Sequence, residues 1–72
     1  MTLTTIIEQD PETGMYIGVI PGIPGAHSQA ETREELTQNM KEVLELCFEE
    51  QPELFVDIPK FIGTEEVELA ST

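Results

Sequence analysis

A stripe of apolar residues at helical spacing is the feature that most constrains the fold of this chain. Thr32 is a favoured N-cap residue, and Glu35 follows three positions later, a pair typical of the first turn of a helix. Pro52 cannot continue a helix, so the sequence predicts one helix from Thr32 to about Glu50. The apolar positions recur three or four residues apart, as on a helix that buries one face. They are Leu36, Met40, Val43, Leu44, Cys47 and Phe48.

The residues before this helix predict three short strands. Residues 3–9 and 15–20 are rich in β-prone side chains, and residues 10–14 between them contain Pro and Gly, so we expect a β-hairpin. Residues 21–25 include two prolines and two glycines and should interrupt regular structure. A third strand is expected over residues 26–30.

The residues after the helix predict an apolar connector and a final strand. The connector spans residues 54–60, and the strand spans residues 62–69, where Val67 and Leu69 alternate with Glu66 and Glu68. The predicted fold is therefore a single α+β domain over residues 1–72, a two-layer sandwich with the order β-β-β-α-β. A last strand parallel to the first would require a right-handed crossover.

The second predicted strand is apolar on both faces. Tyr16, Gly18 and Ile20 should face the helix, because glycine permits close approach, whereas Ile17 and Val19 should face a partner chain. The alternative is that the connector, around residues 54–58, folds over this second face. A chain of this size has a thin core, so self-association into a dimer or tetramer is the expected aid to stability.

The charge balance limits the possible partners. Fifteen acidic residues against three basic ones give a net charge of −12. Arg33, Lys41 and Lys60 are separated along the chain, so we expect no direct contact with nucleic acid. A basic partner would complement this charge. Alternatively, the acidic residues simply keep a small oligomer soluble.

Cysteine, histidine and hydropathy patterns indicate no metal, cofactor or membrane. Cys47 is the only cysteine, and His27 is the only histidine, so neither an internal disulfide nor a metal-ligand cluster is predicted. We expect His27 either to be hydrogen-bonded at a strand start or to contact a partner or ligand. No run approaches the ~20 apolar residues of a membrane span. Without an apparent signal segment, the chain is expected to be cytoplasmic.

One segment carries a family pattern. Residues 16–44 closely resemble the HicB-like antitoxin domain. The matching positions are Tyr16, Gly18, Ile20, Pro21, Pro24, Gly25, His27, Ser28, Gln29, Thr32, Glu34, Glu35, Asn39 and Glu42. The resemblance implies a partial RNase H-like fold and neutralisation of a small basic HicA-type toxin that cleaves messenger RNA. HicB antitoxins commonly carry a C-terminal DNA-binding module, which is not expected in residues 1–72.

These observations lead to two functional expectations. The first is a HicB-like antitoxin or interaction module that binds its basic toxin through Glu34, Glu45 and Glu49. The alternative is a stand-alone oligomeric domain that binds a small ligand or another protein. An RNase H-like fold also raises the possibility of a metal-dependent nuclease, but the first predicted strand contains only Glu8 and the second contains no acid. We therefore expect no enzyme and no catalytic residues.

Overall fold

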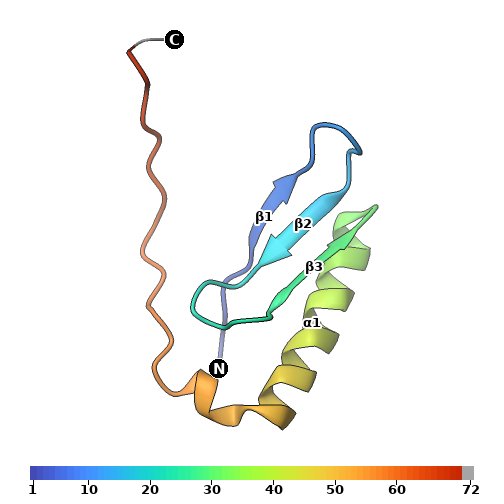
Figure 1. Ribbon diagram of the computed structural model, residues 1–72, viewed down its shortest axis with the longest axis vertical. Coiled ribbons are helices and arrows are strands. Elements are labelled where there is room, and N and C mark those ends of the chain that lie inside the picture. The colour runs from blue at the N-terminus through green and yellow to red at the C-terminus, as the bar shows by residue number, and fades with distance from the viewer. Residues whose placement is uncertain (71–72) are drawn as a thin grey trace.

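A three-stranded antiparallel sheet and one long helix form the body of the chain (Figure 1). The computed structural model describes residues 1–70. Its elements are β1 (Ile6–Gln9), β2 (Tyr16–Val19), β3 (His27–Ala30), α1 (Arg33–Glu50) and the 3₁₀ helix η1 (Pro52–Phe55). The strands lie in the order β1-β2-β3, and α1 packs over β3 and β2. The predicted α+β class and the β-β-β-α arrangement are confirmed.

The turn between β1 and β2 is closed by hydrogen bonds around Asp10. The Gly14 amide donates to the Asp10 carbonyl at 2.8 Å, and the Asp10 amide donates to the Met15 carbonyl at 2.9 Å. The Asp10 carboxylate accepts from the Glu12 amide and the Thr13 hydroxyl, each at 3.0 Å. Gly14 has a φ of 76°, which supplies the left-handed residue expected at the end of a longer hairpin loop.

The Pro-Gly segment between β2 and β3 folds as two successive turns. The Ile23 amide donates to the Ile20 carbonyl at 3.4 Å, and the Ala26 amide donates to the Ile23 carbonyl at 3.1 Å. The Ile20 amide also donates to the Ala26 carbonyl at 2.9 Å and closes the loop. Ile23 is 3% exposed, so this segment contributes a core side chain as well as a change of direction.

The helix begins as predicted. The Thr32 side chain accepts a hydrogen bond from the Glu35 amide at 3.1 Å, and the Gln51 amide donates to the Cys47 carbonyl at the other end. The Asn39 side-chain amide donates to the Gln29 carbonyl in β3, at 3.4 Å. The reason is that α1 packs directly on β3, so the backbone nearest to Asn39 is that of the strand.

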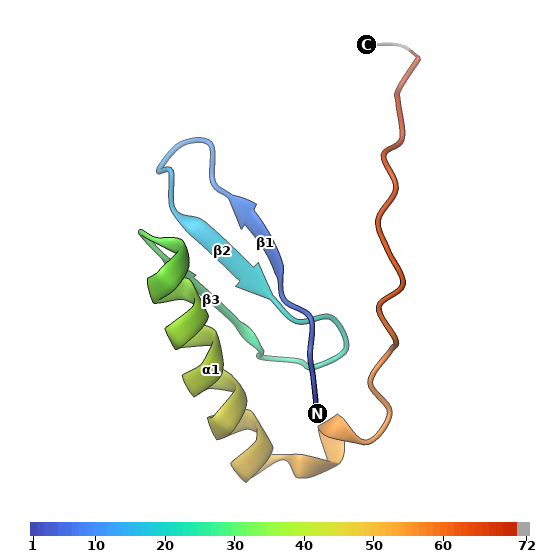
Figure 2. The ribbon, with the colours of Figure 1, turned by 180° about the vertical axis from the view of Figure 1, so that it is seen from behind.

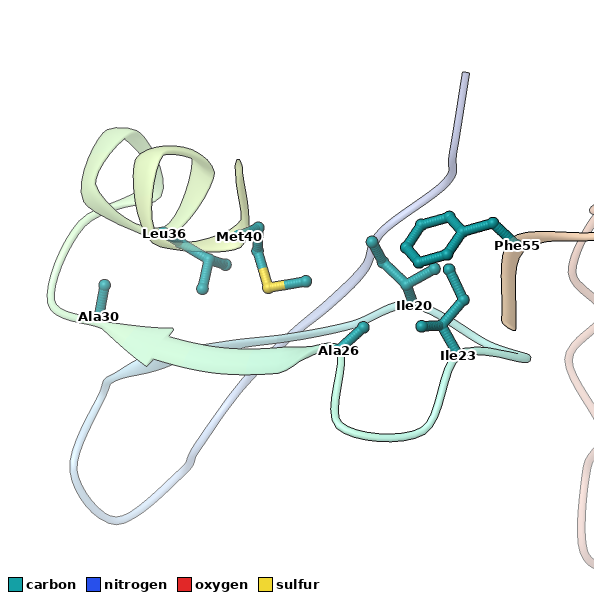
Figure 3. Packing of buried hydrophobic residues seen from close by; sticks show 7 residues of the cluster. All are labelled: Ile20, Ile23, Ala26, Ala30, Leu36, Met40 and Phe55. Atoms are coloured by element: carbon teal, nitrogen blue, oxygen red, sulfur yellow. The ribbon is translucent and has the colours of Figure 1, made fainter. Parts of the chain in front are cut away.

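The core lies between the sheet and α1 and continues to the end of the sheet at the Pro-Gly loop (Figure 3). Figure 3 shows Leu36 and Met40 of α1 on one side and Phe55 beside Ile20 and Ile23 on the other. The buried residues are Ile20, Ile23, Ala26, Ala30, Leu36, Met40 and Phe55.

The connector after α1 packs on the Pro-Gly loop. Phe55 of η1 is 7% exposed within the core, and its ring meets that of Phe48 edge to face, with 5.1 Å between ring centroids. Pro59 lies so close to Gly22 that a Cβ atom at position 22 would collide with the proline ring. This contact fixes the point at which the remaining chain leaves the body.

Residues 58–69, called the arm below, form neither helix nor strand. In Figures 1 and 2 the arm extends away from η1 and stands apart from β1. The final strand predicted over residues 62–69 is therefore absent from the single copy, although ordinary β-alternation is present at Val67 and Leu69. Alternation gives a segment the propensity for a strand, but a strand also needs an edge to pair with, and the arm meets none in one copy.

Candidate partner-binding surfaces

The face of the sheet opposite α1 carries an apolar strip. The strip consists of Ile6, Ile17 and Val19. Ile17 and Val19 are 36% and 38% exposed, and Ile6 lies directly across from Val19 in the β1-β2 register. Because Gly18 between them points toward Leu36, the alternation of β2 follows the predicted assignment of faces.

The connector does not cover this strip. The alternative expectation placed residues 54–58 over Ile17 and Val19, but Phe55 packs against Ile20 and Ile23 on the helix side of the sheet. Ile6 was not selected from the sequence. Its signal was the register of the hairpin, since closing the loop at Gly14 places Ile6 opposite Val19.

His27 borders the apolar strip. It pairs with Val19 in the β2-β3 register, and its side chain is exposed. Its backbone amide donates to the Gly25 carbonyl at 3.0 Å. His27 is thus a hydrogen-bonded residue at the start of β3, as expected, although its imidazole forms no hydrogen bond within residues 1–70. The imidazole is available at the edge of the strip.

The outer face of α1 carries a row of carboxylates. Glu34, Glu45 and Glu49 are all exposed, and their separations of eleven and four residues place them within about 60° of one another around the helix axis. None of the three forms an ion pair within residues 1–70. Glu42, by contrast, accepts a hydrogen bond from Gln38 at 3.3 Å. Lys41 is exposed and falls inside the same row, where it interrupts the negative charge.

Cys47 and the remaining acidic residues form no metal centre in the part of the chain that the structure describes. No group of three His, Cys, Asp or Glu side chains within residues 1–70 is placed to hold an ion. Cys47 is half-buried on the apolar stripe of α1 and packs against the core. Over the same residues, no helix is both long and apolar enough to cross a bilayer.

A groove of about 580 Å³ lies between the N-terminal residues and the start of the arm. One wall is formed by residues 1–4 and the other by residues 55–56 and 58–63, with Ile20 and Pro21 also lining it. Leu3, Phe55 and Ile58 give this groove an apolar lining beside the sheet edge at which β1 begins.

The fold and these surfaces define a class of small α+β domain that exposes an apolar sheet face and an acidic helix. The chain belongs to the UPF0150 family. It is 41% identical over 66 residues to a UPF0150 protein of Thermotoga maritima, covering 92% of this chain and 87% of the relative. It is 45% identical over 62 residues to one of Synechocystis, covering 86% of each chain. The identity to one of Archaeoglobus fulgidus is 38% over 69 residues, covering 96% of each.

No family model matches the chain, and no solved structure matches it. The names of these relatives state no activity, ligand or partner.

Proposed function

We propose that this chain is a HicB-like interaction module that binds and neutralises a small basic HicA-type toxin. The observation that carries the proposal is the unpaired row of Glu34, Glu45 and Glu49 on the outer face of α1, in a chain of net charge −12. The resemblance of residues 16–44 to the HicB-like domain supports the same assignment. On this proposal the chain works in the cytoplasm, without enzymatic activity of its own.

The physical basis of the binding is charge complementarity. A toxin that cleaves messenger RNA needs a cationic surface for phosphate groups, and exposed carboxylates compete for that surface. Glu34 and Glu49 are fifteen residues apart on α1, so the row extends for about 22 Å at 1.5 Å per residue. Long-range attraction of this kind raises the association rate and weakens with ionic strength.

The test uses capture from the native cell extract with paired variants. The wild-type chain should retain a small basic protein that elutes as salt is raised and that cleaves messenger RNA until the chain is added back. Glu45→Lys/Glu49→Lys should lose most of this capture. Glu12→Lys/Glu50→Lys has the same net charge but leaves the row intact, because Glu12 lies in the hairpin turn and Glu50 projects away from the row. Equal capture by the two double variants, or no basic ribonuclease in the eluate, would contradict the proposal.

The apolar strip favours a second candidate, a stand-alone oligomer of dimeric or tetrameric size that binds a small ligand or another protein. Exposed apolar residues on neighbouring strands are typical of an interface. Ile17→Lys and Val19→Lys place a charge on this face and should lower the solution mass while the helix signal in circular dichroism is retained. Gln29→Lys adds a charge on the same face at an already polar position and serves as the control. An unchanged mass in both strip variants would remove the open face as the oligomer interface.

A further inference from the structure

We infer that the arm of one copy pairs as a strand along the free edge of β1 in a second copy, with the two copies exchanging arms reciprocally. This inference does not depend on toxin binding. It assigns a role to the part of the arm beyond Pro59, which forms neither helix nor strand in the single copy.

The surface of the single copy is too large for its mass. A folded monomer of 8.0 kDa exposes about 4,450 Å² by the usual scaling with mass, whereas this chain exposes 6011 Å². Its radius of gyration is 14.2 Å, against about 11 Å for a compact domain of this length. The excess of roughly 1,500 Å² exceeds the ~800 Å² that each partner contributes to a standard interface.

The composition of the connector end and the arm is unlike that of a solvated tail. Val56, Ile62 and Val67 are 75%, 89% and 85% exposed, although solvated tails are poor in aliphatic side chains. Val67 lies between Glu66 and Glu68, so a strand here would have an apolar side and an acidic side. Six residues of strand span about 20 Å, which is enough to cover the length of β1.

The outer edge of β1 has no neighbouring strand within residues 1–70, and α1 does not pack over it. β1 is an outer strand of the sheet, so the backbone groups on its far side have no strand partner within residues 1–70. The Cα atoms of α1 come within 8 Å of those in β2 and β3 but not of those in β1. Leu3 and Ile7 are therefore only half-buried. A strand added here with Val67 on the helix side would extend the core over Ile7, while Glu66 and Glu68 would lie on the open face with Glu8.

Each copy contains both an arm and a free β1 edge. The partner that supplies the added strand is therefore a second copy of the chain. In a two-fold dimer the same exchange occurs twice, so both arms are buried and both β1 edges are capped. The arm leaves the body where Pro59 contacts Gly22, and in one copy its path stands apart from β1. The groove beside residues 1–4 lies at the start of this edge and leaves space for an incoming segment.

The first experiment is the solution mass of the full chain, measured by light scattering at several concentrations and salt levels. We expect twice the 8.0 kDa of one copy. Because both copies carry −12, salt should strengthen this dimer, whereas it should weaken capture of a basic toxin. Val67→Pro removes an amide donor and should give a monomer, while Val67→Thr keeps the amide and the β-branched shape and should remain dimeric.

The second experiment identifies which copy supplies the strand. In a Cys47→Ser background, one chain carries Glu8→Cys and the other carries Glu68→Cys, since both positions fall on the open face in the proposed pairing. Oxidation of the mixture should join the two different chains. A monomeric mass with arm amides protected from hydrogen exchange would mean that the arm pairs with the β1 edge of its own copy. A monomeric mass with arm amides that exchange freely would mean that the arm is a solvated tail. A dimer that survives Val67→Pro but is lost in Ile17→Lys would place the interface on the open face. Each of these three results would overturn the inference.

Discussion

Gly18 of β2 lies directly under Leu36 of α1, so that a Cβ atom at position 18 would sit 3.3 Å from both δ-carbons of the leucine and 3.1 Å from Cγ2 of Thr5. Leu36 is 1% exposed and has no room to move aside. The separation between sheet and helix is therefore set by the absence of a side chain at this position.

Gly18→Ala should destabilise the fold despite the lower chain entropy that alanine gives the unfolded state. We expect a net loss of about 1–2 kcal/mol in the free energy of unfolding, because overpacking outweighs the entropic gain. Urea denaturation followed by circular dichroism at fixed chain concentration measures it. Adding Leu36→Ala should make the combined loss smaller than the sum of the two single losses, since the clash disappears. Additive losses would show that the two residues are not in conflict.

Thr32→Ala should cost about 1 kcal/mol by removing the side-chain acceptor for the Glu35 amide. Thr37→Ala is the matched control, because Thr37 is an exposed residue within α1 whose hydroxyl only donates back to the Arg33 carbonyl. It should be neutral or slightly stabilising, since alanine has the higher helix propensity. Comparing the thermal unfolding of the two variants distinguishes the loss of the N-cap hydrogen bond from a general effect of replacing a threonine.

Phe55→Leu should lower the free energy of unfolding by about 1 kcal/mol, because the smaller side chain fills its buried site less well. Phe48 contacts the same ring but is 55% exposed, so Phe48→Leu should cost clearly less. Parallel urea titrations provide the comparison. Similar losses in both would mean that the ring pair itself, rather than the burial of Phe55 against Ile20 and Ile23, stabilises this end of the domain.

Glu50→Lys should stabilise the helix. The last turn of α1 contains Glu49 and Glu50 and no basic residue, so two negative charges oppose the helix dipole. We expect a gain of about 0.5 kcal/mol at low ionic strength, lost near 1 M salt where charges are screened. Glu12→Lys changes the net charge equally at the hairpin turn and should give a smaller gain. The comparison distinguishes the helix end from a general relief of charge repulsion.

The sequence predicted the helix closely because its signals are local. The Thr32 cap, the apolar period and Pro52 all lie within α1 or next to it, and the structure places α1 at Arg33–Glu50. The three strands were also located, each somewhat shorter than predicted, because residues near the turns have the composition of strands but no partner in the ladder.

Burial of Ile23 and Phe55 was not predicted, since each depends on a contact between segments about thirty residues apart in the chain. The Pro-Gly loop contains Ile23, and η1 contains Phe55, and neither segment has a periodic pattern that would reveal an inward-facing residue. The prediction of a final strand over residues 62–69 was wrong for a related reason. The sequence of the arm does not specify which strand edge it would pair with. Of the candidate surfaces, exposure of Ile17, Val19 and the three glutamates followed from the periods of β2 and α1.

The order of the sheet also bears on how the chain folds. β1 pairs with β2, β2 pairs with β3, and α1 packs chiefly on β3, so most contacts join elements that are neighbours in sequence. Mixed α/β domains fold at rates between those of helical bundles and those of all-β domains. In the proposed dimer, arm exchange is a bimolecular step whose rate increases with chain concentration, so the body would form first as a short-lived monomer. During that interval the β1 edge is open to any extended peptide, and freshly made chains are most exposed to mispairing at that point.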